Sequence, residues 1–314
     1  MSTKNILIAG EKDILSSEAV EYLCSNGSRR HYRFSRVPLD ELRRHVGKSR
    51  NGSACHVIVY PLAANLSRRQ HMELVASRFE GVSVCSSLNF YMQSTGRVPV
   101  KHMKPEWLIH PSGSLTIKSP FHRGLKRTFD IAVSLLSIVA FFPLMALIAA
   151  AVKITSRGPV FYIHERLGLK GKPFRLLKFR TMIVGAEATS GPVWAKKNDP
   201  RVTWAGRILR KTRLDELPQF FNVLKGDMSV VGPRPIRAFF AKKLEKKFPY
   251  YSLRFSVKPG ITGWAQVMGD YGDNMEGQLR KLEFDLFYIQ EYSFLMDLIV
   301  LFKTVSTVAA GKGQ

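Results

Sequence analysis

The feature that most constrains this chain is a long apolar run, residues 128–152, whose one charged residue, Asp130, lies near its start. A bilayer span needs about 20 apolar residues, so the length of the run permits a crossing. Phe142-Pro143 stands near its middle, where a proline removes a helical hydrogen bond and clashes with the preceding turn. The run therefore predicts a membrane helix that is kinked at Pro143.

Basic residues flank both ends of the run, namely Arg123, Lys126 and Arg127 before it and Lys153 and Arg157 after it. Because segments rich in Lys and Arg stay on the cytosolic side, both ends are drawn to that face. A kinked helix that enters the membrane and returns satisfies both observations. Proline-kinked helices that cross the bilayer are also common, so composition alone leaves both topologies open.

The charge balance indicates anionic partners. The chain has 48 Lys and Arg against 24 Asp and Glu, a net charge of +24. Nucleic acid, anionic lipid and phosphorylated substrates would each account for this excess. The apolar run favours lipid and phosphates, and no zinc-finger or RNP1-like pattern supports nucleic acid.

The cysteines and the start of the chain indicate a cytosolic environment. Cys24, Cys55 and Cys85 have neither zinc-site nor CxxC spacing, and three thiols cannot all pair. The first apolar stretch, residues 5–10, is too short for the core of a signal peptide. We therefore expect the soluble part to face the cytosol.

Residues 1–117 are expected to form an α/β domain with a small parallel sheet, because short apolar runs alternate there with helical patterns. Strands are predicted at 5–9, 32–37, 56–60 and 82–86, and helices at 16–25, 39–46 and 67–77. Gly10 follows the first strand, but the further glycines of GxGxxG are missing, so dinucleotide binding is unsupported. A structural or regulatory role is favoured.

The rest of the chain divides into a basic linker at 118–127, the membrane helix at 128–157 and a mainly helical α+β domain at 158–314. In that domain, strands are predicted at 159–163 and 174–179, and helices at 204–211 and 216–224. An apolar C-terminal segment, 294–304, holds Asp297 and Lys303, which suit a helix lying in the membrane interface. A buried core helix explains the segment equally well.

Two adjacent carboxylates, Asp215 and Glu216, are the candidate catalytic residues. A helix tolerates the nearby Pro218 only in its first turn, so the pair is placed at a helix N-terminus. Thr212 and Asp215 could equally form a capping box, which would be purely structural. The pair has many basic neighbours: Arg210, Lys211, Arg213, Lys225 and Arg234. These cations hold both carboxylates ionised, as a nucleophile or a magnesium ligand requires.

Three more segments could bind substrate. Arg234 lies between two prolines, so its planar fork is held for bidentate phosphate binding, although an exposed arginine in a rigid turn is the plain alternative. Lys178 and Arg180 supply two further cations, or else a solvated strand edge. Trp264 and Gln266 could offer a stacking face and an amide to a base or sugar, but a turn with a core tryptophan fits equally well.

Together these motifs resemble the bacterial sugar transferases, the monotopic phosphoglycosyl transferases that begin glycoconjugate assembly. The resemblance covers residues from about 125 to 310. It rests on several ordered motifs: Lys126-Arg-Thr-Phe-Asp130, Phe142-Pro143, Lys178-Phe-Arg-Thr-Met182, Asp199-Pro-Arg201, Leu214-Asp-Glu-Leu217, Asn222-Val-Leu-Lys-Gly-Asp-Met-Ser229, Gly232-Pro-Arg-Pro235 and Pro259-Gly-Ile-Thr-Gly-Trp-Ala-Gln266.

The resemblance implies transfer of a sugar-1-phosphate from a UDP-sugar to undecaprenyl phosphate, with release of UMP, on the cytosolic face of the bacterial inner membrane. It makes Asp215 the covalent nucleophile, which Glu216 positions or activates, and it implies Mg²⁺ bridging Asp215 and the diphosphate. Arg234 would bind phosphate. We place Arg213, Lys178, Arg180, Trp264 and Gln266 in the same substrate site.

The resemblance also implies that the membrane helix re-enters at Phe142-Pro143, where relatives often have Ser before the proline. Longer relatives often carry several membrane spans before a nucleotide-fold-like domain, and residues 1–117 contain none of those spans. Regulation, partner docking and homo-oligomerisation stay open as roles for this domain. The alternative function is a membrane scaffold that recruits glycan-assembly partners through it.

Overall fold

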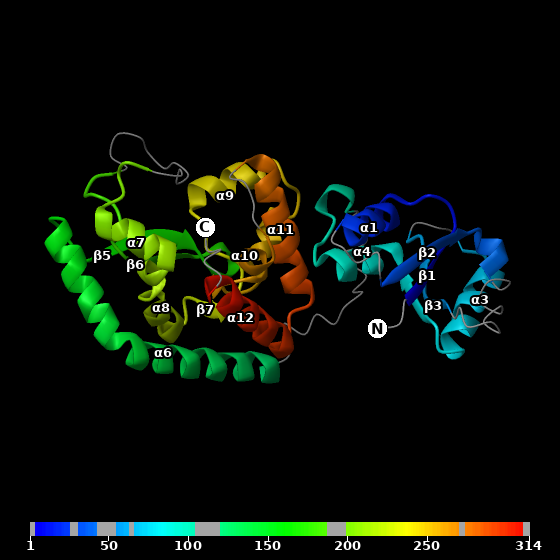
Figure 1. Cartoon of the computed structure of the whole chain (residues 1–314), viewed down its shortest axis with the longest axis horizontal. Helices are drawn as coiled ribbons and strands as arrows, with labels where there is room; N and C mark the ends of the chain where they lie inside the picture. The colour runs from blue at the N-terminus through cyan, green and yellow to red at the C-terminus, as the bar shows by residue number, and fades with distance from the viewer. Residues whose placement is uncertain are drawn as a thin grey trace. The chain divides into compact units, whose positions relative to one another are not determined.

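The computed structural model describes residues 4–25, 31–42, 55–62, 66–103, 120–186, 199–269 and 274–309. The chain forms two compact units, Met1–Ser112 and Gly113–Gln314 (Figure 1). The predicted order of a parallel sheet followed by a mainly helical region with one long apolar helix is confirmed.

The first unit is built on a four-stranded parallel sheet with strand order β2-β1-β3-β4. The strands are β1 Lys4–Ala9, β2 Tyr32–Val37, β3 Cys55–Tyr60 and β4 Ser83–Ser86, each within a residue or so of its predicted bounds. The helices are α1 Ile14–Ser25, η2 Leu39–Glu41, α3 Arg68–Phe79, α4 Ser87–Thr95 and η4 Val100–His102. The helix predicted at 39–46 begins with η2, and its second half lies outside the described residues.

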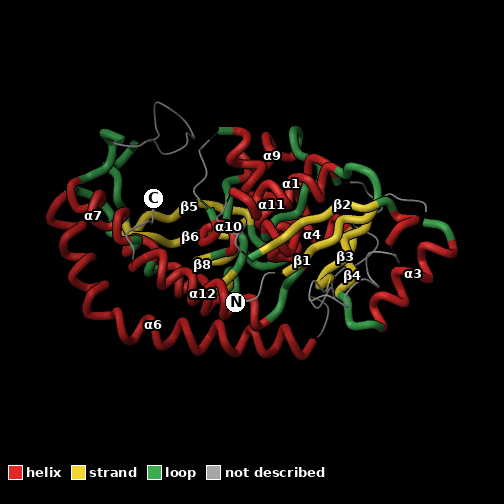
Figure 2. The backbone as a smooth tube through the Cα atoms, turned by 45° about the vertical axis from the view of Figure 1, so that its right-hand side comes forward, coloured by secondary structure: helices red, strands yellow, loops and turns green. Residues whose placement is uncertain are grey.

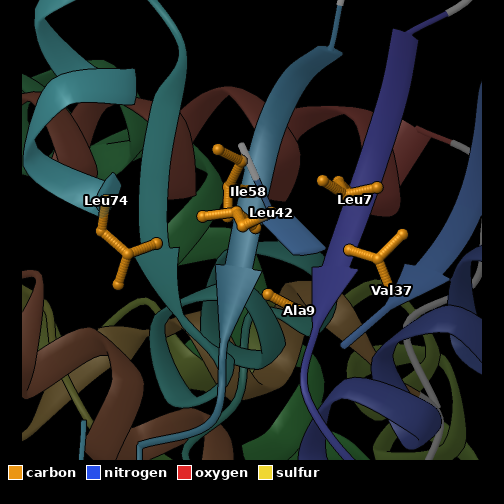
Figure 3. Packing of buried hydrophobic residues seen from close by; sticks show 6 residues of the cluster. All are labelled: Leu7, Ala9, Val37, Leu42, Ile58 and Leu74. Carbon is orange, nitrogen blue, oxygen red and sulfur yellow. The ribbon is translucent and has the colours of Figure 1, made fainter. Parts of the chain in front are cut away.

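Helices cover both faces of this sheet, with α1 and α4 on one side and α3 on the other (Figure 1). On the α3 side, Leu7, Ala9, Val37 and Ile58 of the sheet meet Leu42 and Leu74 in one apolar cluster (Figure 3). Central strands buried on both faces read as continuous apolar runs, which is why β1 was recognisable from the sequence.

The turn after β1 is packed rather than open. Gly10 has φ +95°, and a Cβ there would lie 3.1 Å from Pro61 Cγ and 3.3 Å from Leu39 Cδ1. The positive φ explains the glycine. The two neighbouring side chains occupy the end of β1, where a nucleotide would have to approach the backbone.

The second unit begins with α6 Pro120–Thr155 and a hairpin of antiparallel strands, β5 Phe161–Leu167 and β6 Pro173–Phe179, with η6 Leu169–Gly171 between them. A short parallel pair follows later in the chain, β7 Ser229–Val231 with β8 Gly260–Thr262. The remaining elements are α7 Trp204–Thr212, η7 Leu214–Glu216, α8 Gln219–Lys225, α9 Ala238–Glu245, η8 Tyr251–Ser256, α10 Trp264–Met268, α11 Met275–Gln290 and α12 Phe294–Ala309.

α6 is the one helix in the described residues that is long and apolar enough to cross a membrane. It stays helical through Pro143 and bends partway along its length (Figures 1 and 2). Most of its apolar side chains are exposed, including Leu136, Val139, Phe142 and Leu147. Re-entry at Phe142-Pro143 stays a prediction.

The basic segment expected as a linker is instead the start of α6, from Pro120 onward. Two of its cations, Lys126 and Arg127, have fixed partners, which stabilises the helix there. Arg127 donates at 2.6 Å to the carbonyls of Val223 and Leu224 at the end of α8, where the helix dipole favours a cation. Lys126 reaches into the core.

α12 combines the two alternatives that its sequence left open. Asp297 is 1% exposed and accepts hydrogen bonds from Lys126 Nζ and Tyr288 Oη, each at 2.6 Å. This acid is therefore an internal partner of α6 rather than an interfacial charge. The other side of α12 exposes an apolar stripe: Leu295, Ile299, Phe302 and Val305.

Candidate functional site

Three segments bring the candidate site together: the end of β6 with Lys178, η7 with the acid pair, and the turn after β7 with Arg234. η7 is a 3₁₀ turn that precedes Pro218, and α8 begins only at Gln219, so the pair lies just before the helix rather than in its first turn. Arg213 links α7 to η7 with φ +58°, a left-handed conformation that is uncommon outside glycine. The chain therefore reverses sharply before Asp215.

The capping box considered for Thr212 and Asp215 does not form. Thr212 Oγ1 donates back to the carbonyl of Ile208 at 2.8 Å, and η7 has no side-chain cap. The competing intrahelical acceptor removes the hydroxyl from the turn. The capping-box explanation of Asp215 is thereby excluded.

Glu216 is the centre of a dense ion cluster. Arg234 grips it with both nitrogens, Nη2 at 2.6 Å from Oε1 and Nη1 at 3.3 Å from Oε2. Lys178 Nζ lies 2.9 Å from the same Oε1, and Arg213 Nη1 lies 3.9 Å away. Burial opposes ionisation, but Arg234 and Lys178 outweigh it and hold the pKa of Glu216 well below its usual range.

Asp215 is buried beside this cluster but much less engaged. Its one ion-pair contact within 4 Å in the described residues is Lys178 Nζ, 3.9 Å from Oδ2. Burial raises the pKa of Asp215, against the opposing effect of Lys178. A carboxylate with few partners and raised basicity is the better nucleophile of the two. Glu216 is suited to organising the cations.

A further cation, Arg210, completes the surroundings of Asp215. Its Nε donates to Thr181 Oγ1 at 2.9 Å, and its charge acts on both Asp215 and Asp199. Lys178, Arg210, Arg213 and Arg234 thus form a cationic surround that suits a diphosphate. Among the residues that the structure describes, no group of three or more His, Cys, Asp or Glu could hold a metal ion alone.

Backbone packing fixes the turn that carries Arg234. A Cβ at Gly232 would lie 2.4 Å from the Lys258 carbonyl, and one at Gly263 would lie 2.3 Å from the Gly232 carbonyl. Gly260 is equally tight against Gly232 N, at 2.1 Å. The Gly-Pro-Arg-Pro and Pro-Gly-Ile-Thr-Gly segments therefore interlock, which only glycine permits.

Two buried residues that sequence reasoning missed support the same turn. Arg254 of η8 donates to the Arg234 carbonyl at 3.0 Å and pairs with Asp285 of α11 at 2.7 Å. Both are almost fully buried. Neither belongs to a motif that we singled out, and a lone Arg and a lone Asp 31 positions apart gave no local signal.

Three predicted binding residues have other contacts. Arg180 is 5% exposed and donates to the carbonyls of Ser156 and Arg157 at 2.7 and 3.1 Å, so it caps the end of α6. Trp264 is buried and stacks on Phe287, which is the core-tryptophan alternative.

Gln266 Nε2 donates to the Ile261 carbonyl at 3.3 Å, within its own loop. A place for Arg180, Trp264 and Gln266 in the substrate site stays a prediction. Their motifs stabilise the elements around the acid pair.

Comparison with known proteins finds a matching family and several relatives. The family model for "Bacterial sugar transferase" matches residues 121–311, more than half of the chain. The match spans every element from α6 to α12.

Among curated relatives, a UDP-N-acetylgalactosamine-undecaprenyl-phosphate N-acetylgalactosaminephosphotransferase of Aeromonas hydrophila is 42% identical over 219 residues, 70% of this chain and 50% of that protein. A UDP-glucose:undecaprenyl-phosphate glucose-1-phosphate transferase of Escherichia coli is 46% identical, covering 60% of this chain and 40% of that protein. The chain thus aligns with half or less of these relatives. The exopolysaccharide production protein ExoY of Sinorhizobium fredii is 36% identical, over 60% of this chain and 87% of that protein.

Proposed function

Because this chain belongs to the bacterial sugar transferase family, we propose that it transfers a sugar-1-phosphate from a UDP-sugar to undecaprenyl phosphate. The observation that carries this proposal is the contrast within one acid pair. Glu216 is clamped by Arg234 and Lys178, whereas Asp215 is buried, weakly paired and more basic. Such a pair suits covalent phosphoryl transfer, with one carboxylate reacting and the other organising.

In the first step, an Asp215 oxygen forms a bond to the phosphorus that carries the sugar. The bond from that phosphorus to the bridging oxygen breaks, and UMP leaves with the electron pair. Lys178, Arg213 and Arg234 would stabilise the charge that develops on the phosphate oxygens. Holding the nucleophile on the rigid η7 turn contributes by positioning.

In the second step, an oxygen of undecaprenyl phosphate attacks the same phosphorus. The bond to Asp215 breaks, and its carboxylate is regenerated with its electron pair. The product is an undecaprenyl diphosphate sugar, the starting unit of a polysaccharide or glycoconjugate. Two displacements at one phosphorus divide a difficult transfer into two easier ones.

Mg²⁺ could be held jointly by Asp215 and the phosphates of the substrate. It usually binds through one or two carboxylates plus substrate phosphates, and Asp215 has oxygens left for it. When bound, it would neutralise charge on the diphosphate. Glu216 is unsuited as a ligand because Arg234 and Lys178 already occupy its oxygens.

Membrane attachment would bring the acceptor to the site. α6 exposes its apolar side chains, and α12 exposes a second apolar stripe. We propose that α6 re-enters at Phe142-Pro143 and that the catalytic unit lies on the cytosolic face of the bacterial inner membrane. Single-cysteine labels before Arg127 and after Lys153 should then both react from the cytosolic side. Labelling from opposite sides would refute re-entry.

The reaction is tested by UMP release from a panel of UDP-sugars with undecaprenyl phosphate and Mg²⁺, starting with UDP-glucose and UDP-N-acetylgalactosamine. Wild type should release UMP and retain a sugar phosphate on the protein when the acceptor is omitted, while Asp215→Asn should do neither. Release by Asp215→Asn at the wild-type rate would refute the covalent mechanism. No release from any donor, together with normal glycan in cells carrying Asp215→Asn, would favour the scaffold function.

A further inference from the structure

Helix α3 of the first unit presents an apolar stripe to solvent. Its inner side packs on the sheet through Leu74, which is 6% exposed (Figure 3). Ser77 is also buried, at 5% exposed. Its outer side carries Met72, Val75 and Phe79, with exposed fractions of 62%, 46% and 89%. The spacing of three and four residues places these three side chains along one face of the helix.

The helix itself is well defined, so the stripe has a fixed geometry. Ser67 and Gln70 form a complete capping box at its N-terminus. The Gln70 amide also donates to Asp40 Oδ1 of η2 at 2.8 Å. The exposed stripe is therefore part of a folded surface and not a frayed end.

Arginines border the apolar side chains. Arg68, Arg69 and Arg78 are all exposed, and the single acid of α3, Glu73, is paired with Arg69 at 3.1 Å. The surface thus combines an apolar centre with an excess of positive charge. Cationic side chains beside exposed apolar ones are suited to contact with an anionic headgroup layer.

We propose that the α3 surface, defined as Met72, Val75 and Phe79 with Arg68 and Arg78, docks the first unit on an anionic lipid bilayer. Positive side chains near such a surface are attracted by acidic headgroups, and the apolar side chains enter the headgroup boundary. The first unit is kept near the bilayer because α6, the described helix suited to a membrane, follows it in the same chain. A tether of this kind raises the effective concentration of the bilayer at α3.

A second copy of the chain is a poorer occupant of this surface. Stable interfaces use about 20–30 residues a side, whereas this stripe has three apolar side chains. A two-fold contact between α3 helices would also bring like-charged arginines together. The inference uses the membrane attachment of α6 and is independent of the chemistry at Asp215.

The test uses the full chain in phosphatidylcholine vesicles with about 30% phosphatidylglycerol. Cys24, Cys55 and Cys85 are replaced by alanine, and a nitroxide is attached at Val75→Cys. The control label is at Glu21→Cys, an exposed position on α1 on the other side of the sheet (Figure 1). Accessibility to oxygen, which concentrates in lipid, is compared with accessibility to a nickel chelate, which stays in water.

The Val75 label should show an oxygen-to-nickel ratio several-fold above that of the Glu21 label. Adding Phe79→Ser should reduce the docked population by about tenfold or more, because the aromatic side chain that would enter the bilayer on docking is lost. Arg68→Gln with Arg78→Gln, or vesicles without phosphatidylglycerol, should reduce it as well.

Two results would overturn the proposal. One is a Val75 label as exposed to the nickel chelate as the Glu21 label. The other is dipolar broadening at Val75 that disappears when labelled protein is diluted with unlabelled protein, which would identify a second copy as the occupant. Because both readouts come from labels in the first unit, they are independent of whether UMP is released.

Discussion

Breaking the ion pair between α6 and α12 should destabilise the second unit strongly. Lys126 and Asp297 side chains are 11% and 1% exposed, and their charged atoms are 2.6 Å apart. Removing one partner of such a pair leaves a buried charge without compensation, which costs about 3–5 kcal/mol. Lys126→Met and Asp297→Asn should each fall near the lower value, because Val231 and Tyr288 still supply hydrogen bonds.

The double variant should cost much less than the sum of the single variants, since neither charge of the pair is then left without its partner. We expect a coupling energy of about 2–3 kcal/mol between the two positions. For a unit of this size, a loss of about 3 kcal/mol lowers Tm by roughly 6–12 °C. Thermal unfolding of the detergent-solubilised protein, followed by intrinsic fluorescence, measures all four variants of the cycle.

The matched control is the exposed pair of Glu276 and Arg280 on α11, 3.4 Å apart with side chains 63% and 51% exposed. The same cycle there should give a coupling of about 0.3–0.5 kcal/mol. Strictly additive effects at Lys126 and Asp297, or a coupling no larger than in the control, would refute our account of how α6 is attached.

Three further predictions concern the site and its frame. Burial raises the pKa of Asp215, and a protonated carboxyl cannot attack. As the pH is lowered, kcat/KM should therefore fall with an apparent pKa above the usual aspartate value of about 3.9. An apparent pKa at or below that value would contradict the assignment. Arg234→Lys removes the bidentate hydrogen bonding of a guanidinium, which holds both oxygens of Glu216. The kcat/KM for UMP release should therefore drop about 10- to 100-fold. An unchanged kcat/KM would exclude phosphate binding by Arg234. Gly206→Ala would place a Cβ 2.1 Å from the Thr181 carbonyl and should cost about 1–3 kcal/mol in thermal unfolding, whereas the helical control Gly124→Ala, with nothing within 4 Å, should not destabilise.

Local features of the fold were predictable from the sequence. The strands β1 to β4 were found within a residue or so because apolar runs and turn residues mark them directly. The hairpin strand β6 and the helix α7 were found for the same reason. Pro143 signalled a bend in α6 because the effect of proline acts on its own turn.

Features that depend on distant partners were not predictable. Asp297 looked like an interfacial charge because its partner, Lys126, is 171 positions away in the sequence. Arg180 was grouped with Lys178 as a second phosphate-binding cation. Lys178 on β6 contacts Glu216, whereas Arg180, just after β6, contacts the end of α6. Only tertiary packing separates them.

The division of labour inside the acid pair has the same origin. Adjacent carboxylates share one sequence environment, and the sequence could only place cations near both. The turn after Arg213 places Glu216 in ion pairs with Arg234 and Lys178, whereas Asp215 lies next to these cations with weaker contacts. The resemblance to the family predicts Asp215 as the nucleophile, and the weaker ion pairing and raised pKa of Asp215 support that proposal.

The interlocked glycines bear on how donor preference can diversify. At positions 232, 260 and 263, any larger residue would clash with backbone atoms, which cannot move aside as a side chain can. Substitutions at these positions are therefore not tolerated. A library built to accept a new sugar should leave them constant. It should randomise side chains outside the ion cluster instead, because Arg213 and the other cations are proposed to bind the diphosphate that all such donors share.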